Sequence, residues 1–212
     1  MILGIGHCKG VGKDFLANLI LDECHRIAPD AYVRKQAFAY NLKLVAYNLY
    51  SWAGLGRPED YDSDDGRVMR EVVLPRLGKT PRQIWDGLGW AVRNGVYEDT
   101  FADSLLFHCH EEDVVIIPDV RHPNEVDAVV ARGGKLANVM RPGFLPDAEG
   151  HDSKLAGWDG WHYLVPNFGD NLYEWAKQLA PALVGLGPWP EQSIEEQQAV
   201  WRHCRNAVPG DH

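Results

Sequence analysis

The stretch GIGHCKGVGKD, residues 4–14, has the residue types of a phosphate-binding loop. Its spacing is close to the pattern G-x-x-x-x-G-K-[ST], in which backbone amides surround the phosphates of a nucleotide. Gly10 and Gly12 allow the positive φ angles that turn amides toward one centre, and Lys13 supplies a positive charge for phosphate oxygens. The stretch predicts a nucleotide-phosphate site, and a strand-to-helix turn without a ligand is the alternative.

Two carboxylates predict a magnesium ion beside the nucleotide. Asp14 stands where the pattern has serine or threonine, whose hydroxyl normally binds Mg²⁺. A carboxylate is also a hard oxygen ligand, and without a cation it would repel the phosphates. Asp119 follows the apolar run at 114–117, at a place where a parallel sheet presents ligand-binding residues. Arg121, two residues later, is placed to neutralise phosphate oxygens, with a simple salt bridge to Asp119 as the alternative.

A second potential anion site lies in KTPRQIWDGLG, residues 79–89. Thr80 is a good N-cap and the proline after it suits the first helical position, so a helix is predicted to begin here. Lys79 and Arg82 lie beside this helix start, which favours anions. Trp85 on the same helix is a candidate for stacking on a base, although aromatic residues at helical spacing more often belong to the core. Two anion sites suggest a phosphate donor and a phosphorylated acceptor.

The elements that must position these groups alternate along the chain. Strands are expected at 1–6, 32–38, 114–117, 135–141 and 162–168. Helices are expected at 13–27, 39–54, 80–99, 125–134 and 170–183. This alternation predicts an α/β fold with a parallel sheet. The acidic, turn-rich segment 56–66 is expected to be a mobile loop, and 185–212 an appended arm of unassigned role.

The composition limits the class of protein. The chain has 212 residues, 45% hydrophobic and 24% charged, which suits a soluble globular domain. A net charge of −9 disfavours a nucleic-acid polymer as partner but allows small anionic substrates. Four cysteines without C-x-x-C spacing indicate reduced thiols and a cytoplasmic location, and HCH at 108–110 is expected to be a helix end rather than a metal site. No signal peptide or membrane-spanning segment is expected.

Several segments together resemble the deoxynucleoside monophosphate kinases of the bacteriophage type. They are GVGKD, KTPRQIWDGLG, DVRHPNEVDAVVARGGKLANVMRPG and HDS at 151–153. The resemblance runs in order from about residue 1 to 180, and D-V-R-x-P-N-E is its most specific part. It implies Mg²⁺-dependent transfer of the ATP γ-phosphate to a deoxynucleoside 5′-monophosphate. The protein is expected to be a monomer or homodimer. The resemblance also implies a P-loop kinase fold over residues 1–184, with a helical lid and acceptor-binding region at about 56–100.

Residue chemistry and this resemblance together give the candidate site. The expected ATP-binding residues are Lys9, Gly10, Val11, Gly12, Lys13, Asp14 and Arg141. The expected acceptor-binding residues are Lys79, Thr80, Arg82, Trp85, Arg121, Asn124 and Glu125. The expected catalytic residues are Lys13, Arg82 and Arg121, and the expected metal ligands are Asp14 and Asp119.

Three positions depart from the family pattern. His7 replaces the first glycine of the loop, Phe15 stands where a hydroxyl often follows Lys-Asp, and Lys154 replaces the glutamate of His-x-Ser-Glu. Three alternatives share the phosphate loop: another small-molecule P-loop kinase, a nucleotide-regulated switch or assembly factor without an acceptor, and an inactive relative.

Overall fold

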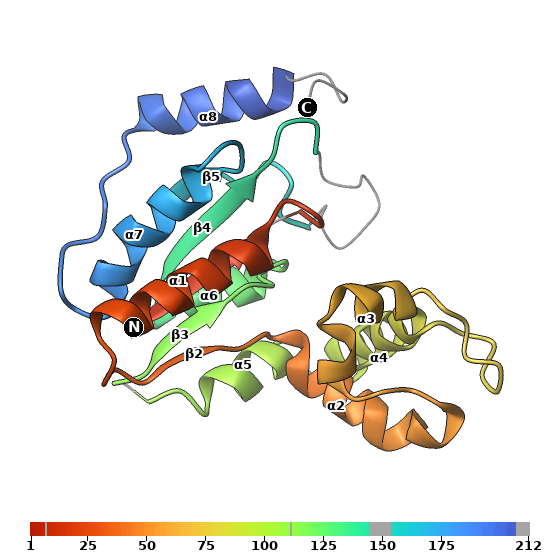
Figure 1. Ribbon diagram of the computed structural model, residues 1–212. Helices are drawn as coiled ribbons and strands as arrows, with labels where there is room; N and C mark the ends of the chain where they lie inside the picture. Colours follow the sequence, from red (N-terminus) through yellow and green to blue (C-terminus); the bar gives the residue numbers. More distant parts are fainter. Residues whose placement is uncertain (7, 111, 145–153, 207–212) are drawn as a thin grey trace. The chain divides into compact units, whose positions relative to one another are not determined.

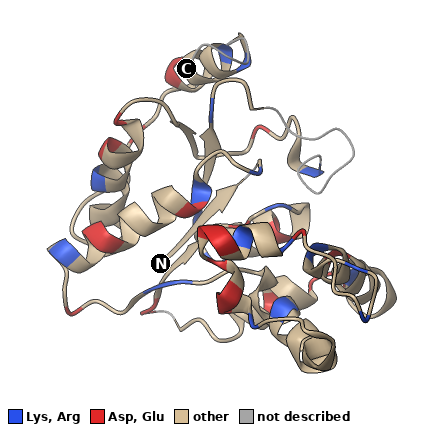
Figure 2. Ribbon diagram, turned by 45° about the vertical axis from the view of Figure 1, so that its right-hand side comes forward, with Lys and Arg blue, Asp and Glu red and all other residues tan. Residues whose placement is uncertain are grey.

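A computed structural model describes residues 1–6, 8–110, 112–144 and 154–206. The chain divides into two compact units, the first formed by residues 1–37 with 109–212 and the second by 38–108 (Figure 1). The second unit contains the segment 56–100, expected to bind the acceptor, and extends beyond it at both ends. Positive and negative residues are interspersed along the helices of both units (Figure 2).

The first unit contains a five-stranded parallel sheet in the order β2-β3-β1-β4-β5, so the predicted α/β fold with a parallel sheet is confirmed. Its strands are β1 (Ile2–Gly6), β2 (Val33–Lys35), β3 (Val114–Ile117), β4 (Lys135–Met140) and β5 (Tyr163–Pro166). Every residue of β1, β3 and β5 is buried. These strands are continuous apolar runs because both faces of a parallel sheet are covered.

Helices cover the sheet of the first unit. Helix α1 (Lys13–Ile27) packs beside α7 (Asn171–Leu183), and both contribute to one core with β1, β3, β4 and β5 (Figure 1). Leu16, Ile20 and Cys24 bury one face of α1 at a spacing of four residues. Helix α6 (Pro123–Ala131) contacts β1 and β4. No helix within the described parts of the chain is long and apolar enough to span a membrane.

The arm at 185–212 belongs to the first unit and contains α8 (Ile194–Asn206), which contacts β4 and β5. The Gln192 side chain bonds both backbone groups of Leu164 in β5, accepting from its N–H at 2.8 Å and donating to its carbonyl at 2.9 Å. These are the bonds that another strand would make at this edge of the sheet. The arm, whose role the sequence did not indicate, therefore covers the edge strand β5.

The described elements of the second unit are helical. They are α2 (Ala39–Tyr50), η1 (Ser51–Ala53), η2 (Pro58–Tyr61), α3 (Asp64–Met69), α4 (Pro81–Gly95) and α5 (Thr100–Leu106). The prediction of a loop at 56–66 is wrong, because this segment contains η2 and the start of α3. Here the turn-forming residues act as caps: the Asp60 carboxylate accepts from the Arg57 N–H at 2.7 Å, and the Ser63 hydroxyl from the Gly66 N–H at 3.0 Å. The helix expected at 80–99 ends at Gly95, and α5 was not predicted.

Candidate functional site

The glycine loop, residues 8–12, connects β1 to α1 at the carboxyl end of the sheet. Gly10 and Gly12 have φ angles of 80° and 100°, the left-handed conformation expected for them. Helix α1 begins directly after Gly12, whose carbonyl accepts the Leu16 N–H at 3.0 Å. His7, the first departure from the usual pattern, lies outside the described residues.

Lys13 is buried although it is charged. Its side chain is only 7% exposed, and its ammonium donates to the Cys8 carbonyl in the glycine loop. The ammonium is therefore held over the loop instead of extending into solvent. Lys9, in contrast, is exposed within the loop. The position of the Lys13 ammonium, close to the loop backbone, would allow it to contact a group bound by the loop.

Asn167, which sequence reasoning missed, fixes the glycine loop from the end of β5. Its side-chain amide donates to the Val11 carbonyl at 2.6 Å. A Cβ on Gly12 would lie 2.5 Å from the same amide nitrogen, so Gly12 is needed for this approach as well as for its φ angle. The available signal was the position of Asn167 immediately after a parallel strand, at the edge where the loop also lies.

Arg141 is placed beside the glycine loop through an aromatic ring. Its guanidinium carbon lies 4.6 Å from the centre of the Phe144 ring, a cation–π contact. The same ring lies 3.1 Å from the position that a Cβ on Gly10 would take. The structure thus brings the residues after β4 to the loop. The HDS segment at 151–153 lies outside the described residues.

Asp119 and Arg121 lie beside the end of β1, from which the glycine loop begins. Between them, the Val120 N–H donates to the Ile5 carbonyl at 3.2 Å. The Val120 carbonyl oxygen lies 3.0 Å from the ideal Cβ position at Gly6. Both side chains are half-buried. The segment expected at the carboxyl end of β3 therefore neighbours the end of β1.

This place in the sheet is a topological switch point. The chain leaves β1 through α1 toward β2, whereas it leaves β3 through α6 toward β4, on the other side of β1. Neighbouring parallel strands whose connections run in opposite directions form a crevice outside their carboxyl ends, where ligands of open α/β sheets bind. The glycine loop and the segment 119–121 both lie at this switch point.

The Glu125 carboxylate stabilises the backbone at Arg121 through hydrogen bonds. Its side chain is 2% exposed, and one carboxylate oxygen accepts from the backbone N–H groups of Arg121 at 2.8 Å and His122 at 3.1 Å. His122 is the N-cap of α6, so these bonds form a capping box. Glu125, which was expected to bind the acceptor, therefore stabilises the turn that follows β3. Asn124, next to it, is half-buried.

The start of α4 has its amides already bonded. Thr80 caps the helix as predicted, with its hydroxyl accepting from the Gln83 N–H at 3.2 Å, and Pro81 has no N–H. The Arg82 N–H donates to the Arg70 carbonyl at 3.2 Å. An anion at this helix start would therefore meet the side chains of Lys79 and Arg82 rather than free amides. The Arg82 guanidinium forms an ion pair with the Glu71 carboxylate.

Trp85 is a core residue of the second unit. Its ring is buried and contacts the Tyr61 ring edge to face, with 5.0 Å between centroids. The Lys43 ammonium lies 5.3 Å from its centroid. A ring covered in this way is not available to stack on a base, so the structure supports the alternative, a packing role.

The described residues contain no group of three or more His, Cys, Asp or Glu side chains arranged to hold a metal ion. Magnesium in phosphoryl-transfer sites does not need such a group, because it uses one or two carboxylates together with substrate phosphates and water. Asp14, exposed in the first turn of α1, and the half-buried Asp119 fit that donor set. Phe15 contributes no hydroxyl and instead contacts Tyr173 of α7, with 5.8 Å between ring centroids.

No protein-family model matches the chain, and no curated protein matches it.

Proposed function

We propose that the protein is a kinase that transfers the γ-phosphate of ATP to a deoxynucleoside 5′-monophosphate in the presence of Mg²⁺. One observation supports this most strongly. A loop with two left-handed glycines and a lysine at the start of the next helix lies beside Asp119 and Arg121, at the switch point of a parallel sheet.

The donor half of the reaction is assigned to the glycine loop. Phosphoryl transfer requires in-line positioning and neutralisation of the charge that spreads over phosphate oxygens. Lys13, already held over the loop by Cys8, supplies one positive charge. Asp14 and Asp119 would hold Mg²⁺, which neutralises charge on the phosphates when it is bound. Arg141 and Lys9 are further cationic groups at the loop among the described residues.

The acceptor half of the reaction requires cationic groups but no general base, because a phosphate monoester is largely ionised near neutral pH. Arg121 is assigned to phosphate oxygens because the Glu125 capping box fixes its backbone. In the second unit, Lys79 and Arg82 are suited to a monoester. A phosphate that binds Arg82 would replace its present partner, the Glu71 carboxylate.

Formation of nucleoside diphosphate tests this proposal. The protein is incubated with ATP, Mg²⁺ and each common deoxy- or ribonucleoside monophosphate in turn, and the products are separated by chromatography. Lys13→Ala is expected to abolish turnover without unfolding the protein. Arg121→Ala is expected to lower turnover by about 10²- to 10³-fold, a typical loss for one charge-stabilising donor, while ATP binding survives.

The matched control is Lys177→Ala on α7. This lysine is exposed and pairs with Glu174, so its loss removes a positive charge without touching the glycine loop. The proposal would be overturned if none of the monophosphates were phosphorylated. Full activity of Lys13→Ala would also overturn it. Slow ATP hydrolysis that no monophosphate alters would instead favour a nucleotide-regulated switch.

A further inference from the structure

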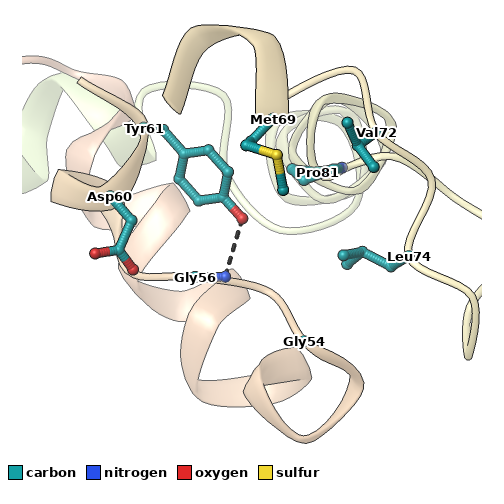
Figure 3. Close-up of a pocket in the computed structure, with 8 residues that line it drawn as sticks. All are labelled: Gly54, Gly56, Asp60, Tyr61, Met69, Val72, Leu74 and Pro81. Carbon is teal, nitrogen blue, oxygen red and sulfur yellow. Dashed lines mark hydrogen bonds between the residues drawn. The ribbon is translucent and has the colours of Figure 1, made fainter. Parts of the chain in front are cut away.

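The second unit has an open pocket that the donor chemistry does not use. It has a volume of about 180 Å³ and lies among η2, the end of α3 and the start of α4 (Figure 3). Its apolar wall is formed by Met69, Val72, Leu74 and Pro81, and the Tyr61 ring lies across from them. Ligand pockets for drug-sized molecules measure about 300–1,000 Å³, so this pocket suits a single ring system.

The apolar wall of this pocket is unusually accessible. Met69 is 52% exposed and Val72 is 43% exposed, although both are hydrophobic. Apolar side chains grouped around a hollow indicate a surface that gains free energy when a ligand covers it. A flat ring can contact such a wall over its whole face.

A hydroxyl donor is fixed in the same pocket. Tyr61 is only 4% exposed, and its hydroxyl oxygen accepts from the Gly56 N–H at 2.9 Å (Figure 3). An ordinary tyrosine hydroxyl keeps its proton at neutral pH, and burial raises the pKa of Tyr61 further. That proton has no acceptor among the residues that the structure describes. Since buried donors are normally satisfied, an acceptor atom of a ligand or of water is expected here.

Cationic side chains flank the pocket in the sequence. Pro81 in its wall is followed directly by Arg82, and Leu74 in its wall forms a backbone bridge with Lys79, donating to the Lys79 carbonyl at 2.9 Å. An uncharged apolar ligand would not need these cations. A ligand with a ring at one end and a phosphate at the other uses both features.

We propose that this pocket binds the heterocyclic base of the acceptor nucleotide. The apolar wall covers the face of the base, and the Tyr61 hydroxyl donates to a carbonyl oxygen or ring nitrogen at its edge. The Asp60 carboxylate, which also lines the pocket, is an acceptor for an amino group of the base. This inference rests on the proposed kinase function, and it names the part of the protein that selects among bases.

Filling the pocket tests the inference. Val72→Trp places a large ring in the hollow, and it is expected to raise KM for the monophosphate at least tenfold while the Kd for ATP is unchanged. Val68→Trp is the matched control, because Val68 lies four residues earlier, in α3, and is exposed but does not line the pocket. Tyr61→Phe keeps the ring and removes the hydroxyl, with both its donor and its bond from the Gly56 N–H. KM is expected to rise roughly twofold to tenfold, the usual effect of one hydrogen bond to a ligand.

The outcomes separate the pocket from the kinase assignment. If the protein is an active kinase and Val72→Trp has the KM of the wild type, the pocket inference is wrong and the kinase proposal stands. If the protein has no kinase activity, calorimetry with each deoxynucleoside, which lacks the phosphate, decides the inference alone. Binding that Val72→Trp abolishes and Val68→Trp keeps would support it, and absence of binding would overturn it.

Discussion

The substitution Gly12→Ala separates two reasons for a glycine in the loop. With φ at 100°, an alanine there would adopt a left-handed conformation that costs about 1–2 kcal/mol. Its Cβ would also lie 2.5 Å from the Asn167 amide nitrogen, and such overpacking costs about 1–3 kcal/mol. We therefore expect Gly12→Ala to lower the free energy of unfolding by about 2–5 kcal/mol.

The double variant Gly12→Ala/Asn167→Ala should be less destabilised than the sum of its single changes. Asn167→Ala alone loses the hydrogen bond to the Val11 carbonyl, worth about 0.5–1.5 kcal/mol. It also removes the atom that meets the new Cβ, so only the conformational cost of Gly12→Ala remains. The expected coupling energy equals the overpacking cost, about 1–3 kcal/mol.

Urea unfolding of the four proteins, followed by circular dichroism with comparable m-values, measures this coupling. Gly133→Ala provides the control. Gly133 has a φ of 69° and nothing within 4 Å of its ideal Cβ, so it has the conformational cost without the contact and should show no coupling with Asn167→Ala. Additive effects of the two loop substitutions would refute the argument that Asn167 requires a glycine at position 12.

Further predictions concern other contacts of the first unit. Gln192→Ala should cost about 1–3 kcal/mol and cause concentration-dependent association in light scattering, because Leu164 in the edge strand loses two hydrogen bonds; an equally stable monomer would contradict this. Burial, with a smaller effect of Lys135, lowers the pKa of His162 below 6.5. Since the unfolded chain binds that proton better, the stability contributed by neutral His162 is complete above about pH 6.5 and is lost on acidification. Between about pH 7 and 5, the urea midpoint of His162→Gln should therefore fall less than that of the unaltered protein. Gly6→Ala should cost about 1–3 kcal/mol in urea unfolding, because its Cβ would lie 2.4 Å from the Trp161 ring.

Features encoded by neighbouring residues were predictable from the sequence. The apolar runs of β1 and β3, the periodic face of α1 and the Thr80 cap of α4 all depend on residues a few positions apart. The positive φ of the loop glycines and the place of Asp119 after a strand belong to the same class. The parallel sheet followed from the alternation of these elements.

Features that depend on contacts between distant segments were not predictable. Asn167 meets Val11 across 156 positions, and Gln192 meets Leu164 from an arm without a recognisable motif. For Trp85 the helical spacing allowed both a ligand contact and a core position, and only packing against Tyr61 decides between them. In the segment 56–66, turn and helix compete because the same residue types form turns and cap helices.

The position of Lys13 links the fold of the first unit to the proposed reaction. A lysine side chain in solvent loses considerable rotamer entropy when a ligand immobilises it, about 1.5–2 kcal/mol. Here the side chain is already buried and ordered by its bond to the Cys8 carbonyl, so most of that loss accompanies folding rather than nucleotide binding. The ammonium has three N–H donors, and the bond to the Cys8 carbonyl uses one of them. Preorganised charge of this kind stabilises a transition state more than a flexible surface lysine would. The burial and order of Lys13 therefore favour the proposed role of this lysine in phosphoryl transfer.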